Sequence, residues 1–283
     1  MRYKLDNKSS LILEGGGLRG VFTCGVLDSF MEQGIEFPFT IGVSAGACNG
    51  LSYMSGQKYR AKYSNIDLLE KYGYVGIKYL FTQRNIMDFK LLFDKFPTEI
   101  IPYNYDAYRQ SIGRYVMVTT NCITGQANYF EEKNSPKRIM EIVRASSSLP
   151  FVCPISEVDG IPMLDGGITD SVPIKFARKE GYTNNLVVLT RNKGYRKPVS
   201  HNSFFSKLIY GKYPELQKAI NSRNANYNKV MDYIDELEEL GEITVIRPLR
   251  PLEVDRMEKD VSKLNALYRE GYEVGNKIKF EHL

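Results

Sequence analysis

The chain has 283 residues, which is long enough for one large α/β domain with a substantial core. Its hydrophobic fraction of 43% and charged fraction of 25% are ordinary for a globular protein, and its net charge of +5 is too small to indicate a dedicated nucleic-acid-binding protein. No apolar run approaches the ~18 residues that a membrane-spanning helix needs, and no signal-peptide core is visible, so we expect a cytoplasmic protein. Four cysteines without C-x-x-C spacing indicate buried thiols in a reducing compartment: Cys24, Cys48, Cys122 and Cys153.

The N-terminal part of the chain alternates between strand and helix patterns. Residues 9–14 form a predicted buried strand, and residues 20–33 place apolar side chains at helical spacing. Residues 39–43 form the next predicted strand, and a helix is expected from Ala45 onward. This order predicts a parallel sheet with helices on its faces, which is an α/β fold.

The segment 53–108 is unusually rich in aromatic residues. It contains nine tyrosines and four phenylalanines: Tyr53, Tyr59, Tyr63, Tyr72, Tyr74, Tyr79, Tyr103, Tyr105 and Tyr108, with Phe81, Phe89, Phe93 and Phe96. These side chains either form a cap that lines a ligand groove above the site, or simply pack the segment onto the core.

The rest of the chain predicts further strands and helices without an internal repeat. In chain order we expect a strand over 114–121 paired with 126–131, a helix over 136–146 and a hairpin over 154–164 that turns at Asp159-Gly160. We further expect a helix over 172–180, a strand over 186–189, a helix over 214–240, a strand over 243–247 and a helix over 256–277. We therefore predict one domain over residues 1–283, with a motif-bearing core over about 8–197 and a C-terminal extension over about 198–283.

The segment 191–213 is basic and carries aromatic side chains. Between Gly181 and Pro214 the chain has six basic residues and no acidic one, and Phe204 and Phe205 lie among the last of them. The segment either rests on an anionic membrane surface, or it is a solvated loop followed by a short helix.

Residues 42–46, Gly-Val-Ser-Ala-Gly, have the G-x-S-x-G form, in which a serine sits on a sharp turn between a strand and a helix. Gly42 and Gly46 lack side chains, so the strand and the helix can converge around Ser44. This turn exposes the hydroxyl group as a nucleophile. The alternative is a serine that only caps the helix.

The base that such a nucleophile needs is restricted by the composition. The chain has two histidines, and His282 is the penultimate residue. Asp165 ends a short apolar run and precedes Gly166-Gly167, which places a carboxylate on a loop that other backbone can approach closely. We therefore predict a Ser44–Asp165 dyad, and a Ser44–Asp165–His201 triad is the alternative.

The glycine loop at residues 15–20, Gly-Gly-Gly-Leu-Arg-Gly, has two interpretations. The N–H groups of Gly15, Gly16 and Gly17, with that of Ala45, form an oxyanion hole. Alternatively, the G-x-G-x-x-G spacing is a dinucleotide-binding fingerprint, which expects an acidic residue at the end of the second strand, where this chain has the serine motif. Arg19 lies at the helix entry and either shapes the loop or attracts an anionic substrate.

Together these three motifs resemble the patatin-like phospholipase family. They are the glycine loop, the serine motif and Asp165-Gly-Gly, in this order, and the segments 145–150 and 190–195 are also similar to the bacterial branch. The match runs from about residue 8 to about residue 197. The resemblance implies a three-layer α/β/α fold and a Ser–Asp dyad that hydrolyses acyl esters, often of lipids.

We therefore expect a serine acyl hydrolase that acts through Ser44 and Asp165 on a lipid or other acyl ester, with no metal and no organic cofactor. The alternative is a lipid-binding or regulatory module with little turnover. The lipid class, the acyl length and the oligomeric state stay open at this stage.

Overall fold

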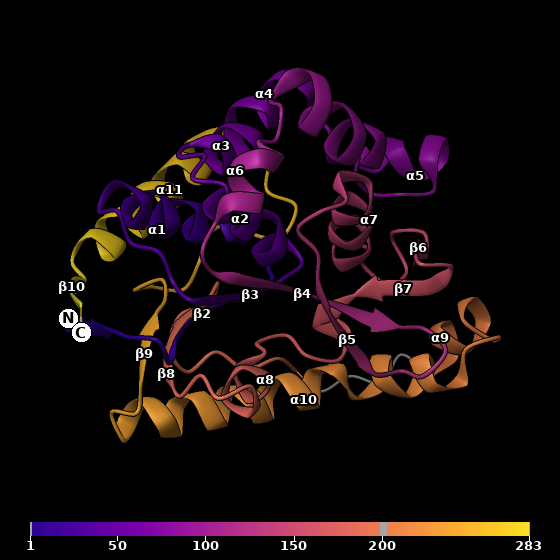
Figure 1. Ribbon diagram of the computed structural model, residues 1–283. Helices are drawn as coiled ribbons and strands as arrows, with labels where there is room; N and C mark the ends of the chain where they lie inside the picture. Colours follow the sequence, from indigo (N-terminus) through magenta and orange to yellow (C-terminus); the bar gives the residue numbers. More distant parts are fainter. Residues whose placement is uncertain (1, 199–202, 283) are drawn as a thin grey trace.

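The computed structural model describes residues 2–198 and 203–282. These residues form an eight-stranded sheet in the order β6-β7-β4-β3-β2-β8-β9, and β5 also pairs with β4 (Figure 1). Strands β4, β3, β2, β8 and β9 run parallel, whereas β5 and β7 are antiparallel to β4. The strands are β2 (Ser9–Leu13), β3 (Phe39–Val43), β4 (Arg114–Asn121), β5 (Ala127–Glu131), β6 (Ser156–Val158), β7 (Ile161–Asp165), β8 (Asn184–Val188) and β9 (Ile243–Ile246).

Alternate side chains of the central strands face two different cores. Leu11 and Leu13 of β2 lie in the larger core, and Ile12 between them lies in the smaller one. In β4, Met117 faces the larger core and Val118 the smaller. Because successive residues of a strand point to opposite faces, these apolar runs bury both faces of the sheet.

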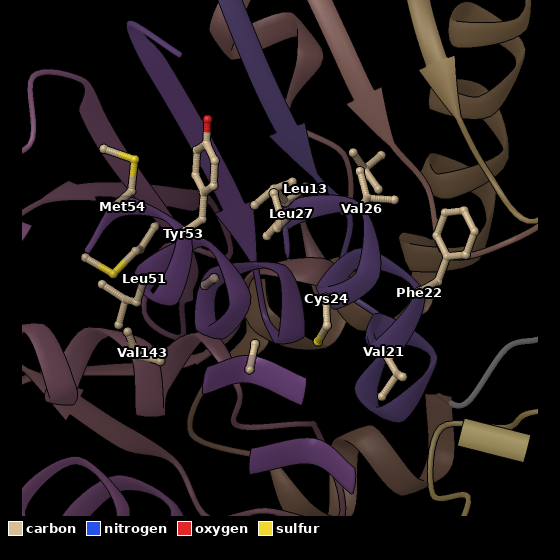
Figure 2. Packing of buried hydrophobic residues seen from close by; sticks show 14 of the residues in the cluster. Leu13, Val21, Phe22, Cys24, Val26, Leu27, Leu51, Tyr53, Met54 and Val143 are labelled. Carbon is tan, nitrogen blue, oxygen red and sulfur yellow. The ribbon is translucent and has the colours of Figure 1, made fainter. Parts of the chain in front are cut away.

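Helices cover both faces of the sheet, so the predicted three-layer α/β/α fold is confirmed (Figure 1). In the view of Figure 1, α1 (Val21–Glu32), α2 (Ala45–Met54), α7 (Pro136–Ser146) and α11 (Val261–Asn276) lie above the sheet. Helices α8 (Ile174–Lys179) and α10 (Pro214–Glu239) lie below it. Figure 2 shows apolar side chains of α1 and α2 gathered over the sheet, among them Phe22, Val26, Leu27, Leu51 and Met54.

After the end of α2 at Met54, the aromatic-rich segment 53–108 folds into short helices, of which α4 and α5 lie at the top of the molecule in Figure 1. They are α3 (Arg60–Lys62), α4 (Leu68–Tyr72), α5 (Lys78–Gln83), α6 (Tyr105–Gln110) and the π-helical segments Tyr63–Asp67 and Leu91–Ile100. Tyr108 and Phe96 are buried, whereas Phe81 of α5 is 86% exposed. We call residues 55–110 the cap segment.

The C-terminal extension shares the core of the N-terminal half. Helix α11 contacts α1 at backbone distance: a Cβ atom at Gly271 would lie 2.0 Å from the Phe22 carbonyl oxygen, and one at Gly25 would lie 2.1 Å from the Tyr268 carbonyl oxygen. The Tyr268 hydroxyl donates to the buried Asp28 carboxylate of α1 at 2.8 Å. The two helices therefore pack as one unit.

Several observed elements differ from the predicted ones. Strands β1 (Arg2–Leu5) and β10 (Lys279–His282) were not expected, and their parallel pairing brings the two ends of the described chain together. The helix predicted from residue 256 begins at Val261, because Asp260 caps it by accepting the N–H groups of Ser262 and Lys263.

Candidate functional site

Strands β3 and β7 end head to head on the same edge of β4. Val118 of β4 pairs with Val43, the last residue of β3, and Thr119 pairs with Asp165, the last residue of β7. The opposite edge of β4 is occupied by β5 over the same residues. The two chain segments that leave β3 and β7 therefore start side by side, and these segments carry Ser44 and Asp165.

Ser44 occupies a strained turn between β3 and α2. Its backbone has φ 55° and ψ −121°, which is unusual for a residue with a side chain. A Cβ atom at Gly42 would lie 2.6 Å from the Gly46 carbonyl oxygen, and one at Gly46 would lie 2.4 Å from the Leu13 carbonyl oxygen. The two glycines are thus required by close backbone approach, as the G-x-S-x-G motif predicts. No hydrogen bond from the Ser44 side chain caps α2, so the helix-capping alternative for this serine is not observed.

The turn is held by Ser146, a fully buried residue of α7. Its Oγ accepts the Ser44 backbone N–H at 2.9 Å and donates to the Val118 carbonyl oxygen at 2.6 Å. The hydroxyl therefore links the serine turn to the strand on which β3 and β7 meet. Ser146 belongs to the serine run whose similarity to the family was noted, but its role depends on a contact 102 residues away in the chain.

Asp165 is 1% exposed, and its two carboxylate oxygens differ in their contacts. Oδ1 accepts the Gly167 N–H at 2.7 Å, which caps the short 3₁₀ helix Gly166–Ile168. That helix follows the aspartate directly, whereas the sequence analysis expected helix only from about residue 172. Oδ2 is buried and has no hydrogen-bond partner among the described residues. A buried carboxylate oxygen without a partner is free to accept a proton.

The glycine loop lies against the serine turn. A Cβ atom at Gly15 would lie 2.9 Å from the Ser44 Cβ atom, so no larger residue fits without a shift. Gly17 has φ 58° and begins a 3₁₀ helix (Gly17–Gly20), and Ala45 begins α2. N–H groups in the first turn of a helix have no acceptor within that helix. The predicted oxyanion donors thus lie in one region, next to Ser44.

Hydrogen bonds of Glu14 and Thr190 hold the start of the glycine loop in place. The Glu14 carboxylate accepts the Thr190 backbone N–H at 2.5 Å and the Tyr227 hydroxyl at 3.1 Å. Thr190 Oγ1 donates to this carboxylate at 3.0 Å and also lies 3.1 Å from the Gly15 carbonyl oxygen. Glu14 was not singled out from the sequence, although its position directly before the glycines was a usable signal.

Ser44 lies where two pockets meet. The first, which we call the basic pocket, is lined by Ser44, Asp165, Gly15, Gly16 and Gly17 together with the cationic side chains of Arg19, Lys197, Arg223 and Arg256. The second, which we call the apolar pocket, has a volume of about 130 Å³. It is lined by Ser44 and by apolar residues that include Tyr74, Leu92, Phe93, Phe96, Met140 and Val143.

The cap segment supplies much of the apolar pocket. Tyr74, Phe93, Phe96 and Tyr103 line it, whereas Tyr53 and Tyr108 are buried elsewhere in the core. Some aromatic residues therefore line a pocket next to Ser44, and others only pack onto the core.

Other predicted residues have varied positions. Gly166 is required by close packing, because a Cβ atom there would lie 2.3 Å from the Val118 carbonyl oxygen. Arg19 is 4% exposed, and its Nε has no hydrogen-bond partner among the described residues. His201, the base of the alternative triad, lies outside the described residues.

Two further observations concern cofactors and membranes. Within residues 2–198 and 203–282, no group of three His, Cys, Asp or Glu side chains could hold a metal ion. In the same part of the chain, no helix is both long and apolar enough to cross a bilayer.

The fold and the motif-bearing turns define a patatin-type α/β/α protein. Residues 11–178 match the family model described as patatin-like phospholipase, and because this match covers more than half of the chain, the protein belongs to that family. Residues 213–282 match a second model, described as a domain of unknown function (DUF6363). Family membership supports lipid acyl hydrolase activity in general.

The chain is also similar to curated proteins and to a solved structure. The chain is 30% identical over 186 residues to the uncharacterized protein YjjU of Escherichia coli, covering 64% of this chain and 51% of YjjU. It is 26% identical over 212 residues to lysophospholipase NTE1 of Candida albicans, covering 71% of this chain and 14% of NTE1. The chain thus spans about half the length of YjjU and much less of NTE1. Among solved structures, VipD of Legionella pneumophila is 15% identical with a TM-score of 0.48, over 95% of this chain and 66% of that one.

Proposed function

We propose that the protein is a carboxylic ester hydrolase that cleaves lipid acyl esters, with Ser44 as the nucleophile and Asp165 as the base. The observation that supports this proposal is the meeting of β3 and β7 on β4, because the segments that carry the strained Ser44 turn and Asp165 start there side by side. Asp165 Oδ2 is buried and has no partner among the described residues. A nucleophile and a base on neighbouring rigid strand ends are what acyl transfer needs. Ser44 and Asp165 line one pocket, which supports the pairing.

The reaction follows from these positions. As Ser44 Oγ attacks the acyl carbonyl carbon, Asp165 Oδ2 takes the hydroxyl proton. The C–O bond to the alcohol then breaks, and the proton passes from Asp165 to the leaving oxygen. Water next attacks the acyl-serine ester while Asp165 takes a proton from it. Return of that proton to Ser44 Oγ releases the carboxylic acid and restores the enzyme.

The oxyanion of both tetrahedral intermediates is assigned to backbone N–H groups. In this proposal the donors come from Gly15, Gly16 and Gly17 of the glycine loop and from Ala45 at the start of α2. Each such donor contributes roughly 3–4 kcal/mol to transition-state stabilisation in related sites. The start of α2 also carries the positive end of a helix dipole, which favours a negative charge at this point.

The apolar pocket is the proposed acyl-chain site. It begins at Ser44 and continues beneath the cap segment between Phe93, Phe96 and Met140. Burial of an acyl chain there gains about 0.8 kcal/mol for each methylene removed from water. Longer acyl chains therefore bind more tightly until the pocket is filled.

Hydrolysis of p-nitrophenyl esters of increasing acyl length tests the proposal. We expect Ser44→Ala to lower kcat about 10³-fold or more and Asp165→Asn to lower it by about 10²-fold or more. Asp159→Asn is the matched control, because Asp159 is an exposed hairpin aspartate that pairs with Arg138. It should retain normal activity.

Covalent labelling separates a hydrolase from a binding module. A fluorophosphonate ester should modify Ser44, as peptide mass analysis would show, and Asp165→Asn should slow the modification. If Ser44→Ala turns over esters as fast as the unaltered protein, the hydrolase proposal is wrong. Acyl-ester binding without turnover or labelling would instead identify a lipid-binding module.

We also propose peripheral contact with an anionic membrane surface through α9 (Ser203–Ile209). Phe205, Leu208 and Ile209 are 61%, 72% and 52% exposed, and Lys207 and Lys212 are exposed beside them. Exposed apolar side chains with flanking lysines favour anionic headgroups. Co-sedimentation with phosphatidylglycerol vesicles should weaken in Leu208→Ser and not in Leu249→Ser, because Leu249 is also 72% exposed but lies elsewhere. Equal loss in both variants, or equal binding to phosphatidylcholine vesicles, would contradict this contact.

A further inference from the structure

Four cationic side chains converge on the pocket that contains Ser44 and Asp165. Arg19 comes from the glycine loop and Lys197 from the chain after β8, whereas Arg223 lies on α10 and Arg256 in the loop before α11. The last two belong to the region that matches the domain of unknown function, outside the patatin-like match. The C-terminal extension therefore brings its own charges to the site.

These cations have no direct ion-pair partner among the described residues. No carboxylate oxygen of the described residues lies within 4.0 Å of the charged nitrogens of Arg19, Lys197, Arg223 or Arg256. The two carboxylates that line the pocket, Glu14 and Asp165, attract these cations only at longer range. Glu14 accepts hydrogen bonds from Thr190 and Tyr227, and Asp165 accepts one from Gly167.

The cations also destabilise one another. Burial lowers the pKa of Arg19 to about 10, and repulsion by Arg256 contributes to the shift. Burial lowers the pKa of Lys197 to about 7, and here Arg223 adds repulsion. Positive groups that are desolvated and close together favour the binding of an anion between them.

Two contacts show that the cationic groups are held in place. Arg223 Nε donates to the Gly167 carbonyl oxygen at 2.8 Å, which leaves the rest of its guanidinium for other acceptors. The Lys197 Nζ lies 3.5 Å from the centre of the Tyr227 ring. Arg19 is only 4% exposed, and its Nε has no hydrogen-bond partner in the described part of the chain. A buried guanidinium N–H without an acceptor is a vacant hydrogen-bond donor, and it belongs to a residue that lines this pocket.

We propose that this basic pocket is an anion subsite that binds the phosphate group of the substrate, and that the C-terminal extension makes the enzyme selective for lipids with net negative head groups. The proposal rests on the ester hydrolase function. With the acyl chain in the apolar pocket and the ester at Ser44, the phosphate lies between Arg19, Arg223 and Arg256. Four cationic side chains line the pocket against two carboxylates, Glu14 and Asp165, so the ammonium of a zwitterionic head group is repelled and such a head group gains less than a phosphomonoester.

The test compares two esters that differ only in the phosphate group. For lysophosphatidic acid and for monoacylglycerol with the same acyl chain, kcat/KM is measured in the unaltered protein, Arg256→Gln and Arg250→Gln. We expect a higher kcat/KM for lysophosphatidic acid, and an approximately tenfold fall of the ratio between the two substrates in Arg256→Gln. Arg250 is an exposed arginine of the same loop, so Arg250→Gln makes the same change of net charge and should leave the ratio unaltered.

The ratio is informative because damage to the catalytic groups lowers both rates together. If the unaltered protein has the same kcat/KM for lysophosphatidic acid and for monoacylglycerol, the proposal is overturned. A preference for lysophosphatidic acid that Arg256→Gln does not change would also overturn it, because the selectivity would then arise elsewhere. Inorganic phosphate distinguishes a headgroup site from an effector site: competition with lysophosphatidic acid supports the former, and equal inhibition of both substrates contradicts it.

Failure of the hydrolase function gives a different result. If no ester is hydrolysed, calorimetric titration of Ser44→Ala with glycerol phosphate at low ionic strength tests the subsite alone. Binding that is lost in the Ser44→Ala, Arg256→Gln double variant supports the anion subsite without any turnover. Absence of binding in Ser44→Ala would reject the subsite itself.

Discussion

Arg223 of α10 donates its Nε–H to the Gly167 carbonyl oxygen across 2.8 Å, and this bond joins the C-terminal extension to the loop that carries Asp165. A second bond does the same for the glycine loop, because the Leu18 N–H donates to the Arg256 carbonyl oxygen at 3.1 Å. Both segments next to Ser44 are thus supported by residues outside the patatin-like match. The extension acts as structural support for the site as well as a source of charge.

Replacement of Arg223 tests this support. We expect Arg223→Met to lower kcat/KM for p-nitrophenyl esters about tenfold, because the Gly167 carbonyl oxygen loses its donor and the Asp165 loop is no longer held. The free energy of unfolding should change by less than the roughly 1.4 kcal/mol that corresponds to a tenfold effect, since removal of a desolvated cation offsets the lost hydrogen bond. Steady-state kinetics and urea unfolding measure the two effects. Arg109→Met, which removes an exposed arginine paired with Asp106, should alter neither quantity.

Ser146 should matter for both stability and activity. In Ser146→Ala the Ser44 N–H and the Val118 carbonyl oxygen lose their shared partner inside the protein. We expect a loss of roughly 2 kcal/mol in the free energy of unfolding, together with a fall in kcat as the serine turn relaxes. Ser148→Ala is the comparison, because the Ser148 hydroxyl bonds to the Arg144 carbonyl oxygen and to Ser156, away from the turn. A normal kcat in Ser146→Ala would contradict the assigned role.

The contribution of Lys197 to the free energy of unfolding should become more favourable as pH rises above 7. Its pKa is about 7 in the folded protein, below the ordinary value of 10.5, because burial disfavours the charged form. Below pH 7 the full cost of burying the charge is present, and this cost falls as pH rises from 7 towards 10.5. Lys197→Met should therefore be more stable relative to the unaltered protein at pH 7 than at pH 9. The advantage should shrink by roughly 1.4 kcal/mol per pH unit. Urea unfolding of both proteins at each pH measures it, and an advantage that grows with pH would reverse the assigned sign.

The contact between α1 and α11 should not tolerate a methyl group. Alanine in place of a glycine inside a helix ordinarily stabilises it by roughly 1 kcal/mol. Gly271→Ala should instead destabilise by about 2 kcal/mol or more, because its Cβ would lie 2.0 Å from the Phe22 carbonyl oxygen. Thermal unfolding compared with Glu273→Ala, an exposed change on the same helix, checks this. A higher midpoint in Gly271→Ala would mean that the helices are not in contact.

Local sequence was sufficient for much of the fold. The strand 39–43, the strand 114–121 and the helix 136–146 have the bounds that were expected, because each has a regular apolar pattern and a clear start or stop. The hairpin before Asp165 turns at Asp159-Gly160, and both residues have positive φ as that turn type requires. The terminal strands β1 and β10 were missed, because each is short and stabilised mainly by pairing with the other.

For the site, local sequence predicts the features that lie within short segments, and only the tertiary structure shows the contacts between residues far apart along the chain. The glycines around Ser44 and the strand that ends at Asp165 are properties of short segments, so the residue types there are sufficient to predict the strained serine turn, the strand end at Asp165 and the close approach of the glycine loop. Tertiary structure decided the rest: the meeting of β3 and β7 on β4, the Ser146 bridge and the arrival of Arg223 and Arg256. Arg223 contacts a residue 56 positions away, and such a contact exists only once α10 has packed beneath the sheet. A charged side chain far from any motif resembles an ordinary surface residue until packing places it next to the serine.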